Sequence, residues 1–108
     1  RAFRKAWEAG DVRGLLAVLA PDATATGDGG GRVTALPEPL VGAEQIAAFY
    51  AGRSPQGLQL LERTVNGQPG LVVRSHGVTV LVAAFEVVAG RIEHIWAVLN
   101  PDKLHSWG

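Results

Sequence analysis

Three carboxylates and one tyrosine are the side chains of this sequence best suited to acid–base chemistry. Abstraction of a proton beside a carbonyl group needs a carboxylate base, together with a second acid or a tyrosine that stabilises the enolate oxygen. Asp28, Glu62 and Glu86 fall in predicted strands, and Tyr50 falls in a predicted helix. The spacing does not pair any of these carboxylates with a histidine or with the tyrosine. We therefore assign no catalytic residue, and the sequence favours a non-enzymatic role while leaving catalysis open.

Six side chains are candidates to line a pocket. His94 and Trp96 alternate along one predicted strand with Ile92 and Val98, so these four residues should point to the same face of a sheet. Strand parity does not show whether that face is covered or exposed. A lone histidine among apolar neighbours is more often a hydrogen-bonded structural residue than a catalyst. The full set of pocket candidates is Trp7, Tyr50, Arg74, Glu86, His94 and Trp96.

No cofactor or metal site is expected. The three histidines lack the spacing of metal ligands, and the sequence has no cysteine to supply a thiolate. The glycine triplet at positions 29–31 is not followed by a predicted helix, so it lacks the helix N-terminus of a phosphate-binding loop.

Composition and length indicate one globular domain that comprises residues 1–108. Hydrophobic residues make up 47% of the chain and charged residues 19%, which is not the profile of a disordered segment. Ten cationic side chains balance ten acidic ones, so this segment is not expected to bind nucleic acid directly. The longest apolar run, Val78–Phe85, is too short to span a membrane.

The beginning of the sequence and its lack of cysteine indicate its origin. The chain opens at Arg1 directly in a helical pattern and without a methionine, so we expect a domain taken from a longer protein. The absence of cysteine fits a reducing cytoplasm, which is the localisation that we expect.

Two helices are predicted at the start of the chain. Phe3 and Trp7 share one face of the first, which ends at Gly10. Asp11 is the predicted N-cap of the second, which Pro21 stops. The apolar stripe of the second helix consists of Val12, Leu15, Leu16 and Leu19.

The rest of the chain is predicted to form two strands, one helix and then four more strands. A hairpin of Ala23–Asp28 and Arg32–Ala35 precedes a third helix that lies between Gly42 and Gly52. Short connections join the last four strands, which favours antiparallel pairing. These strands are Leu58–Val65, Leu71–His76, Val78–Val88 and Arg91–Leu99. The predicted fold class is α+β, with about three helices in the N-terminal half packed on a curved antiparallel sheet.

This order of elements resembles the SnoaL-like domain, a cone of the nuclear-transport-factor-like and cystatin-like type. In that family the helices cover the concave face of a bent sheet and leave a pocket between them. The stretch Trp7–Leu16 resembles the opening helices of such domains, and Val65–Leu71 is similar to a central hairpin. Asp28–Val33 and Asn100–Leu104 are similar to two signature motifs of extracytoplasmic-function sigma factors that carry a SnoaL-like domain.

One stretch departs from the pattern of those sigma factors. Leu36–Leu40 is similar to a segment that they place in the linker between their polymerase-binding regions. Here it falls inside the domain, so we assign it no function.

The resemblance implies a regulatory C-terminal domain that modulates sigma activity in transcription initiation through intramolecular contacts. Its partners would be the sigma-factor core regions of the same polypeptide and, through them, RNA polymerase, with DNA bound only by the full-length protein. Two segments would make the contacts. They are the glycine-rich segment (Asp28, Gly29, Gly30, Gly31 and Arg32) and the proline-containing segment (Asn100, Pro101, Asp102, Lys103 and Leu104).

Simpler interpretations of both segments stay open, as do two other functions. The glycines can serve only to close a turn, and residues 100–104 only to fold back on the domain. The alternative function is a small enzyme of the polyketide cyclase, ketosteroid isomerase or epoxide hydrolase type that works in the cone. A third is a domain with a filled pocket that only forms a homodimer. We also expect that the cone can bind a small apolar ligand, and that the domain contacts no membrane and needs no cofactor.

Overall fold

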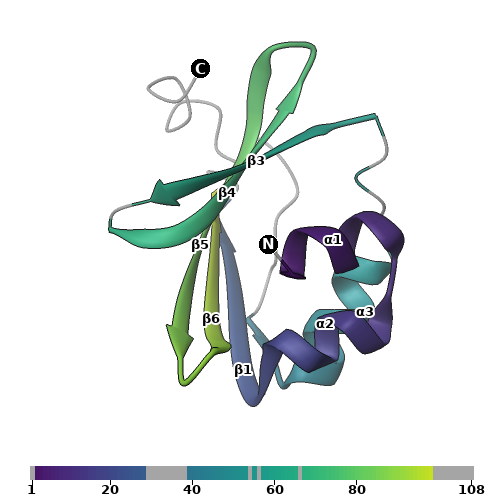
Figure 1. Cartoon of the computed structure of the whole chain (residues 1–108), viewed down its shortest axis with the longest axis vertical. Helices are drawn as coiled ribbons and strands as arrows, with labels where there is room; N and C mark the ends of the chain where they lie inside the picture. Colours follow the sequence, from purple (N-terminus) through teal and green to yellow (C-terminus); the bar gives the residue numbers. More distant parts are fainter. Residues whose placement is uncertain (1, 29–38, 54, 56, 66, 99–108) are drawn as a thin grey trace.

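Three helices cover one face of a bent mixed sheet (Figure 1). The computed structural model describes residues 2–28, 39–53, 55, 57–65 and 67–98. Within these ranges the sheet has six strands in the order β2-β1-β6-β5-β4-β3. The helices are α1 (Ala2–Ala9), α2 (Val12–Val18) and α3 (Ala43–Ala51). The strands are β1 (Leu19–Asp28), β2 (Leu40–Val41), β3 (Gln59–Val65), β4 (Gln68–Ser75), β5 (Val78–Val88) and β6 (Arg91–Val98).

The helix starts follow the predicted capping and periodicity. Phe3 and Trp7 are both buried on α1, and the Asp11 carboxylate accepts a hydrogen bond from the Gly14 N–H at 3.0 Å. Helix α2 ends at Val18 rather than at Pro21. The residue before a proline disfavours the helical conformation, and Ala20, which precedes Pro21, accordingly lies in β1. Val12 is 43% exposed, so it does not belong to the buried stripe.

The last four strands form the antiparallel meander that the sequence predicts. The predicted break over residues 66–70 is too long, since β4 already begins at Gln68. Pro69 lies opposite Thr64 of β3 and precedes Gly70, which is the first residue of β4 paired with β5. The missing N–H of Pro69 therefore lies outside the ladder to β5.

Strand β1 is parallel to β6, and this pairing makes the sheet mixed rather than wholly antiparallel. The argument from short connections holds only for consecutive strands, whereas β2, α3 and the first three strands of the meander separate β1 from β6. The second neighbour of β1 is β2, which pairs with it in antiparallel orientation. The predicted return strand at residues 32–35 lies outside the described residues.

The main core lies between the helices and the sheet. Ala23 and Ala25 of β1 are fully buried, and their small side chains let α3 pack closely on this strand. Four aromatic rings from α1, α3 and β5 pack together at the centre of this core, and the centroids of neighbouring rings are 5.1–6.2 Å apart. They belong to Phe3, Trp7, Tyr50 and Phe85. A smaller buried cluster lies on the opposite sheet face and consists of Val65, Val72, Val82 and Ala84.

The β5–β6 turn contains a strained residue that offers a test of the fold. Ala89 has a φ of 52° and is followed by Gly90 with a φ of 80°. Two consecutive positive φ values match the hairpin turn in which Asn-Gly is the preferred pair. A residue with a Cβ is disfavoured at the first position, and asparagine is disfavoured least.

We expect Ala89→Asn to raise the free energy of unfolding by about 0.5–1 kcal/mol, because asparagine relieves part of this strain. Ala89→Val should lower it, since a β-branched side chain fits positive φ poorly. Urea denaturation of both variants measures the change. Equal stability of all three proteins would contradict the turn geometry.

Candidate functional site

A group of polar side chains occupies the sheet face opposite the helices. Thr24 and Thr26 of β1 alternate with the buried alanines of the main core, so their hydroxyls point to this outer face. His94 and Trp96 of β6 lie beside them in register, and Glu86 of β5 lies on the other side of His94. We call Thr24, Thr26, Glu86, His94 and Trp96 the His94 cluster.

Both ring nitrogens of His94 have partners on β1. Nδ1 contacts the Thr24 hydroxyl, and Nε2 lies 3.3 Å from the Thr26 Oγ1. The imidazole also packs on Trp96, with ring centroids 4.1 Å apart. Neither nitrogen is left to act as a general base. This geometry is that of a structural histidine that connects β1 to β6.

Burial governs the protonation of His94. Partial burial lowers the pKa of His94 below its usual range, and the negative charge of Glu86 raises it by a smaller amount. The folded domain therefore favours the neutral imidazole. Glu86 and His94 form the carboxylate–histidine pair of the described residues that comes nearest to acid–base chemistry, but they lie on an open sheet face.

The predicted shared face of four β6 residues is wrong at one position. Glu86 pairs with His94 and Val87 pairs with Ile92, so Glu93 is an extra residue that forms a bulge. A bulge reverses the side-chain alternation of a strand. Ile92 consequently belongs to the main core, whereas His94 and Trp96 lie on the outer face.

Trp7 and Tyr50 lie in the main core, on the other side of the sheet. The Trp7 indole N–H donates a hydrogen bond to the Arg53 carbonyl at 2.8 Å, and its ring packs edge-on against Tyr50 at 5.2 Å. Burial raises the pKa of Tyr50 to about 12, so its phenol stays protonated at neutral pH. These two aromatic residues are therefore packed parts of the main core.

The six pocket candidates therefore divide between different parts of the fold. Arg74 lies near the β4–β5 turn, opposite Thr79, and is half-buried. Glu62, a candidate base, lies on the helix side of β3, where Arg4 of α1 forms an ion pair with it at 2.8 Å. Among the described residues, Tyr50 thus has no carboxylate partner in the core.

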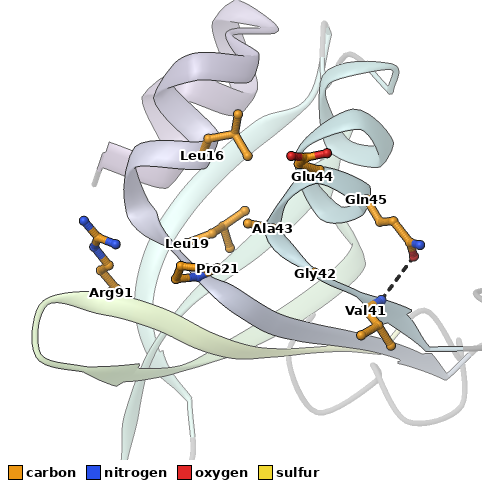
Figure 2. A pocket seen from close by; sticks show the side chains of 9 residues that line it. All are labelled: Leu16, Leu19, Pro21, Val41, Gly42, Ala43, Glu44, Gln45 and Arg91. Carbon is orange, nitrogen blue, oxygen red and sulfur yellow. Dashed lines mark hydrogen bonds between the residues drawn. The ribbon is translucent and has the colours of Figure 1, made fainter.

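Described residues line two grooves, and none of the six pocket candidates belongs to the lining of these two. Figure 2 shows the first, of about 450 Å³, which is lined by residues of α2, β1, β2 and α3 and of the start of β6. Its lining is Leu16, Leu19, Pro21, Val41, Gly42, Ala43, Glu44, Gln45 and Arg91. The second, of about 420 Å³, is lined by Glu62, Arg63, Thr64, Pro69, Gly70, Leu71 and Phe85. The assignment of these six residues to a ligand-binding pocket stays a prediction.

Thr24 and Thr26 are the members of the His94 cluster that the sequence analysis missed. The signal for them is the alternation Ala23-Thr24-Ala25-Thr26, which gives a strand one small apolar face and one hydroxyl face. Only the pairing of β1 with β6 shows that those hydroxyls meet a histidine.

Asp28 is the described residue of the two predicted contact segments. It is the last residue of β1, and it pairs with Val98, the last residue of β6. Residues 29–32 and 100–104 lie outside the described residues. Because β1 and β6 run parallel, the glycine-rich and proline-containing segments continue from neighbouring points at the same end of the sheet.

Two further findings concern the part of the chain that the structure describes. No helix in it has the length and apolar character needed to cross a bilayer. It also contains no group of three or more histidine, cysteine, aspartate or glutamate side chains arranged to hold a metal ion.

Comparison with known proteins identifies the fold. A family model described as a SnoaL-like domain matches residues 1–98. No curated protein sequence matches the chain. The chain is similar to part of the Mycobacterium tuberculosis extracytoplasmic function sigma factor SigJ, with a TM-score of 0.73 and 24% identity over 96% of this chain. It spans only 41% of the length of that SigJ structure.

Two further solved structures share the fold along most of their own length. An NTF-2 like protein of unknown function from Burkholderia xenovorans has a TM-score of 0.64 and 17% identity, over 99% of this chain and 88% of that one. A candidate ketosteroid isomerase from Kribbella flavida has a TM-score of 0.60 and 17% identity, over 91% of this chain and 72% of that one. Three helices on a mixed sheet are thus an NTF2-like arrangement of the α+β class.

The two described tryptophans give a first test of the division between the faces. Trp7 is 7% exposed in the core, whereas Trp96 is 41% exposed on the outer face. We expect Trp7→Ala to lower the free energy of unfolding by about 3–5 kcal/mol. Trp96→Ala should lower it by about 1 kcal/mol or less. Similar losses in urea denaturation would show that the two side chains are not on different faces as described.

The pH dependence of stability gives a second test. Because the folded state favours neutral His94, the unfolded chain binds the proton first as the pH falls. The contribution of His94 is therefore present above about pH 6.5, the usual histidine value, and is lost as the pH falls through the lower pKa of the folded state. We expect the free energy of unfolding to decrease from pH 7.5 to pH 5.5, and to decrease less in His94→Gln. The same slope in both proteins would refute this assignment.

Proposed function

This chain belongs to the SnoaL-like domain family, and we propose that it is the regulatory C-terminal domain of an extracytoplasmic-function sigma factor. In this proposal the glycine-rich and proline-containing segments contact the sigma-factor core regions of the same polypeptide. These contacts modulate sigma activity in transcription initiation, and the domain reaches RNA polymerase only through those regions. Such a protein works in the cytoplasm, where its polymerase is.

The parallel pairing of β1 with β6 is the observation that carries this proposal. Residues 28 and 98 are far apart in the sequence, yet they are paired neighbours in the sheet. A polypeptide surface that contacts this end of the sheet would meet the two described residues, Asp28 and Val98, after which these segments follow in the sequence. Together the two segments carry two acidic and two cationic side chains, Asp28, Arg32, Asp102 and Lys103. That balance suits a protein surface of mixed charge better than a nucleic acid.

The separation of the described acidic side chains from Tyr50 and His94's engagement with two threonines support a binding role over an enzymatic one. An acid–base enzyme in this fold needs a proton acceptor and a second polar group that face one substrate position inside the cone. In the described structure, Tyr50 packs among aromatic rings, Arg4 forms an ion pair with Glu62, and Glu86 lies on the outer face. The likeness to a candidate ketosteroid isomerase is a likeness of fold, and one fold supports many functions.

Charge reversal in the two segments tests the proposal in the intact protein. Arg32→Glu combined with Lys103→Glu should change transcription from a target promoter by about threefold to tenfold, because a lost charge contact is worth about 1 kcal/mol. The matched control is Arg13→Glu combined with Lys5→Glu, since both of these residues are exposed on α2 and α1. The control should leave transcription unchanged.

Two further variants separate loss of contact from loss of folding. Gly30→Val and deletion of residues 100–104 should alter transcription while the isolated domain keeps its circular dichroism spectrum. Unchanged promoter output in the charge reversal, in Gly30→Val and in the deletion would overturn the proposed contact surface.

A further inference from the structure

We infer that the end of the sheet where β6 begins is a self-association surface, at which two copies of this domain pair about a two-fold axis. In the pair, the β5–β6 turn of each copy enters the groove of Figure 2 on the other copy. The inference does not depend on the proposed function, because Asp28 and Val98 lie at the opposite end of the same two strands.

The β5–β6 turn presents an apolar tip to solvent at the end of the sheet (Figure 1). Val87 is 45% exposed and Val88 is 48% exposed, and Ala89 and Gly90 are exposed as well. We call residues 87–90 the apolar tip. Turns are usually built from polar residues, glycine and proline. Consecutive exposed apolar residues at such a turn indicate a surface that another polypeptide covers.

Ala89 makes this tip more apolar at a cost in backbone strain. Its φ of 52° is a conformation that asparagine adopts more readily than alanine does. Alanine gives up that advantage and keeps a polar amide group out of the tip. Strain that is retained at one residue points to a function for that residue. Here the function is contact with an apolar surface.

A groove with a largely apolar lining lies beside the tip. Arg91 directly follows the tip and lines this groove, which has a volume of about 450 Å³. Leu16, Leu19 and Ala43 contribute apolar side chains to the lining (Figure 2). Val41, which also lines the groove, is 59% exposed. An exposed apolar tip and an apolar groove thus adjoin each other on one domain.

This arrangement suits pairing with a second copy of the chain. A two-fold interface brings the same patch of two copies together, so the patch must be complementary to itself. A two-fold axis that passes between the tip and the groove places the tip of each copy in the groove of the other. A different protein would have to supply both a matching groove and a matching tip, whereas a second copy supplies both.

The charges at the groove are complementary in such a pair. Figure 2 shows Arg91 and Glu44 on opposite sides of the groove. Both residues are exposed, and neither forms an ion pair with another described residue. Because Arg91 follows the tip, the tip of one copy brings its Arg91 within reach of Glu44 on the other copy. The two-fold axis produces this contact twice.

Sedimentation velocity of the 108-residue chain tests the inference. We expect a reversible monomer–dimer equilibrium with a Kd of about 10–100 µM, because a small contact surface supports only weak association. Val88→Asp should raise this Kd by about tenfold or more, since it places a charge in the apolar contact. The matched control is Val78→Asp, because Val78 is 62% exposed and lies at the other end of β5. The control should leave the Kd unchanged.

Reversal of the two groove charges makes the test specific to this pairing. Arg91→Glu places two carboxylates opposite each other, and Glu44→Arg places two guanidinium groups opposite each other. Each variant alone should therefore dimerise about threefold to tenfold more weakly. An equimolar mixture of the two variants restores both contacts in a heterodimer, and its Kd should return to within about twofold of the original value. Both residues are exposed, and circular dichroism verifies that the variants fold.

Three results would overturn the inference. They are a chain that stays monomeric up to about 500 µM, equal weakening by Val88→Asp and Val78→Asp, and a mixture that associates no better than its components. Each of these leaves the proposed function standing, because its contact segments follow Asp28 and Val98 at the other end of the strands. Conversely, unchanged promoter output in the charge-reversal experiment would leave the measured dimer intact.

Discussion

The parallel pairing of β1 with β6 is the constraint on which the rest of this structure depends. It joins the helical N-terminal part of the chain to the meander, which would otherwise be a separate antiparallel sheet. On its inner face, Ala23, Ala25 and Ile95 are fully buried beneath the helices. On its outer face, two threonine hydroxyls meet His94. At its end, the two segments with a resemblance to sigma-factor motifs continue from neighbouring residues.

Local sequence signals were sufficient to predict most of the elements. Helix caps such as Asp11 and breaks such as Gly77 act over a few residues, so the sequence shows them directly. The meander follows for the same reason, since its turns are short. The parallel pairing of β1 with β6 could not be predicted in this way, because the two strands are far apart in the sequence and no local pattern indicates that they pair. The Glu93 bulge was missed because nothing in the sequence shows that β6 carries one residue more than β5 opposite it.

The candidate site was harder to predict than the fold, and the reason is again physical. The sequence places Trp7 and Tyr50 in helices, as the structure does. Whether these side chains are buried depends on which face of the sheet the helices cover, and the sequence does not show this. His94 illustrates the same limit. Its residue type suggests proton transfer, whereas its two threonine partners, contributed by a distant strand, engage both nitrogens in hydrogen bonds. The SnoaL-like fold by itself does not decide between an enzyme and a binding module, because the decision lies in the residues that line the cone.

Site-specific photo-crosslinking in the intact protein tests the central claim most directly, namely that the two segments form one contact surface for the sigma-factor core regions. A photoreactive amino acid is placed at position 32 in one sample, at position 103 in a second and at position 13 in a control, and the crosslinked peptides are identified by mass spectrometry. We expect positions 32 and 103 to crosslink to the same sigma-factor region of the same polypeptide, and position 13 not to do so. Crosslinks from both segments that stay within residues 1–108, or that reach unrelated regions, would contradict it.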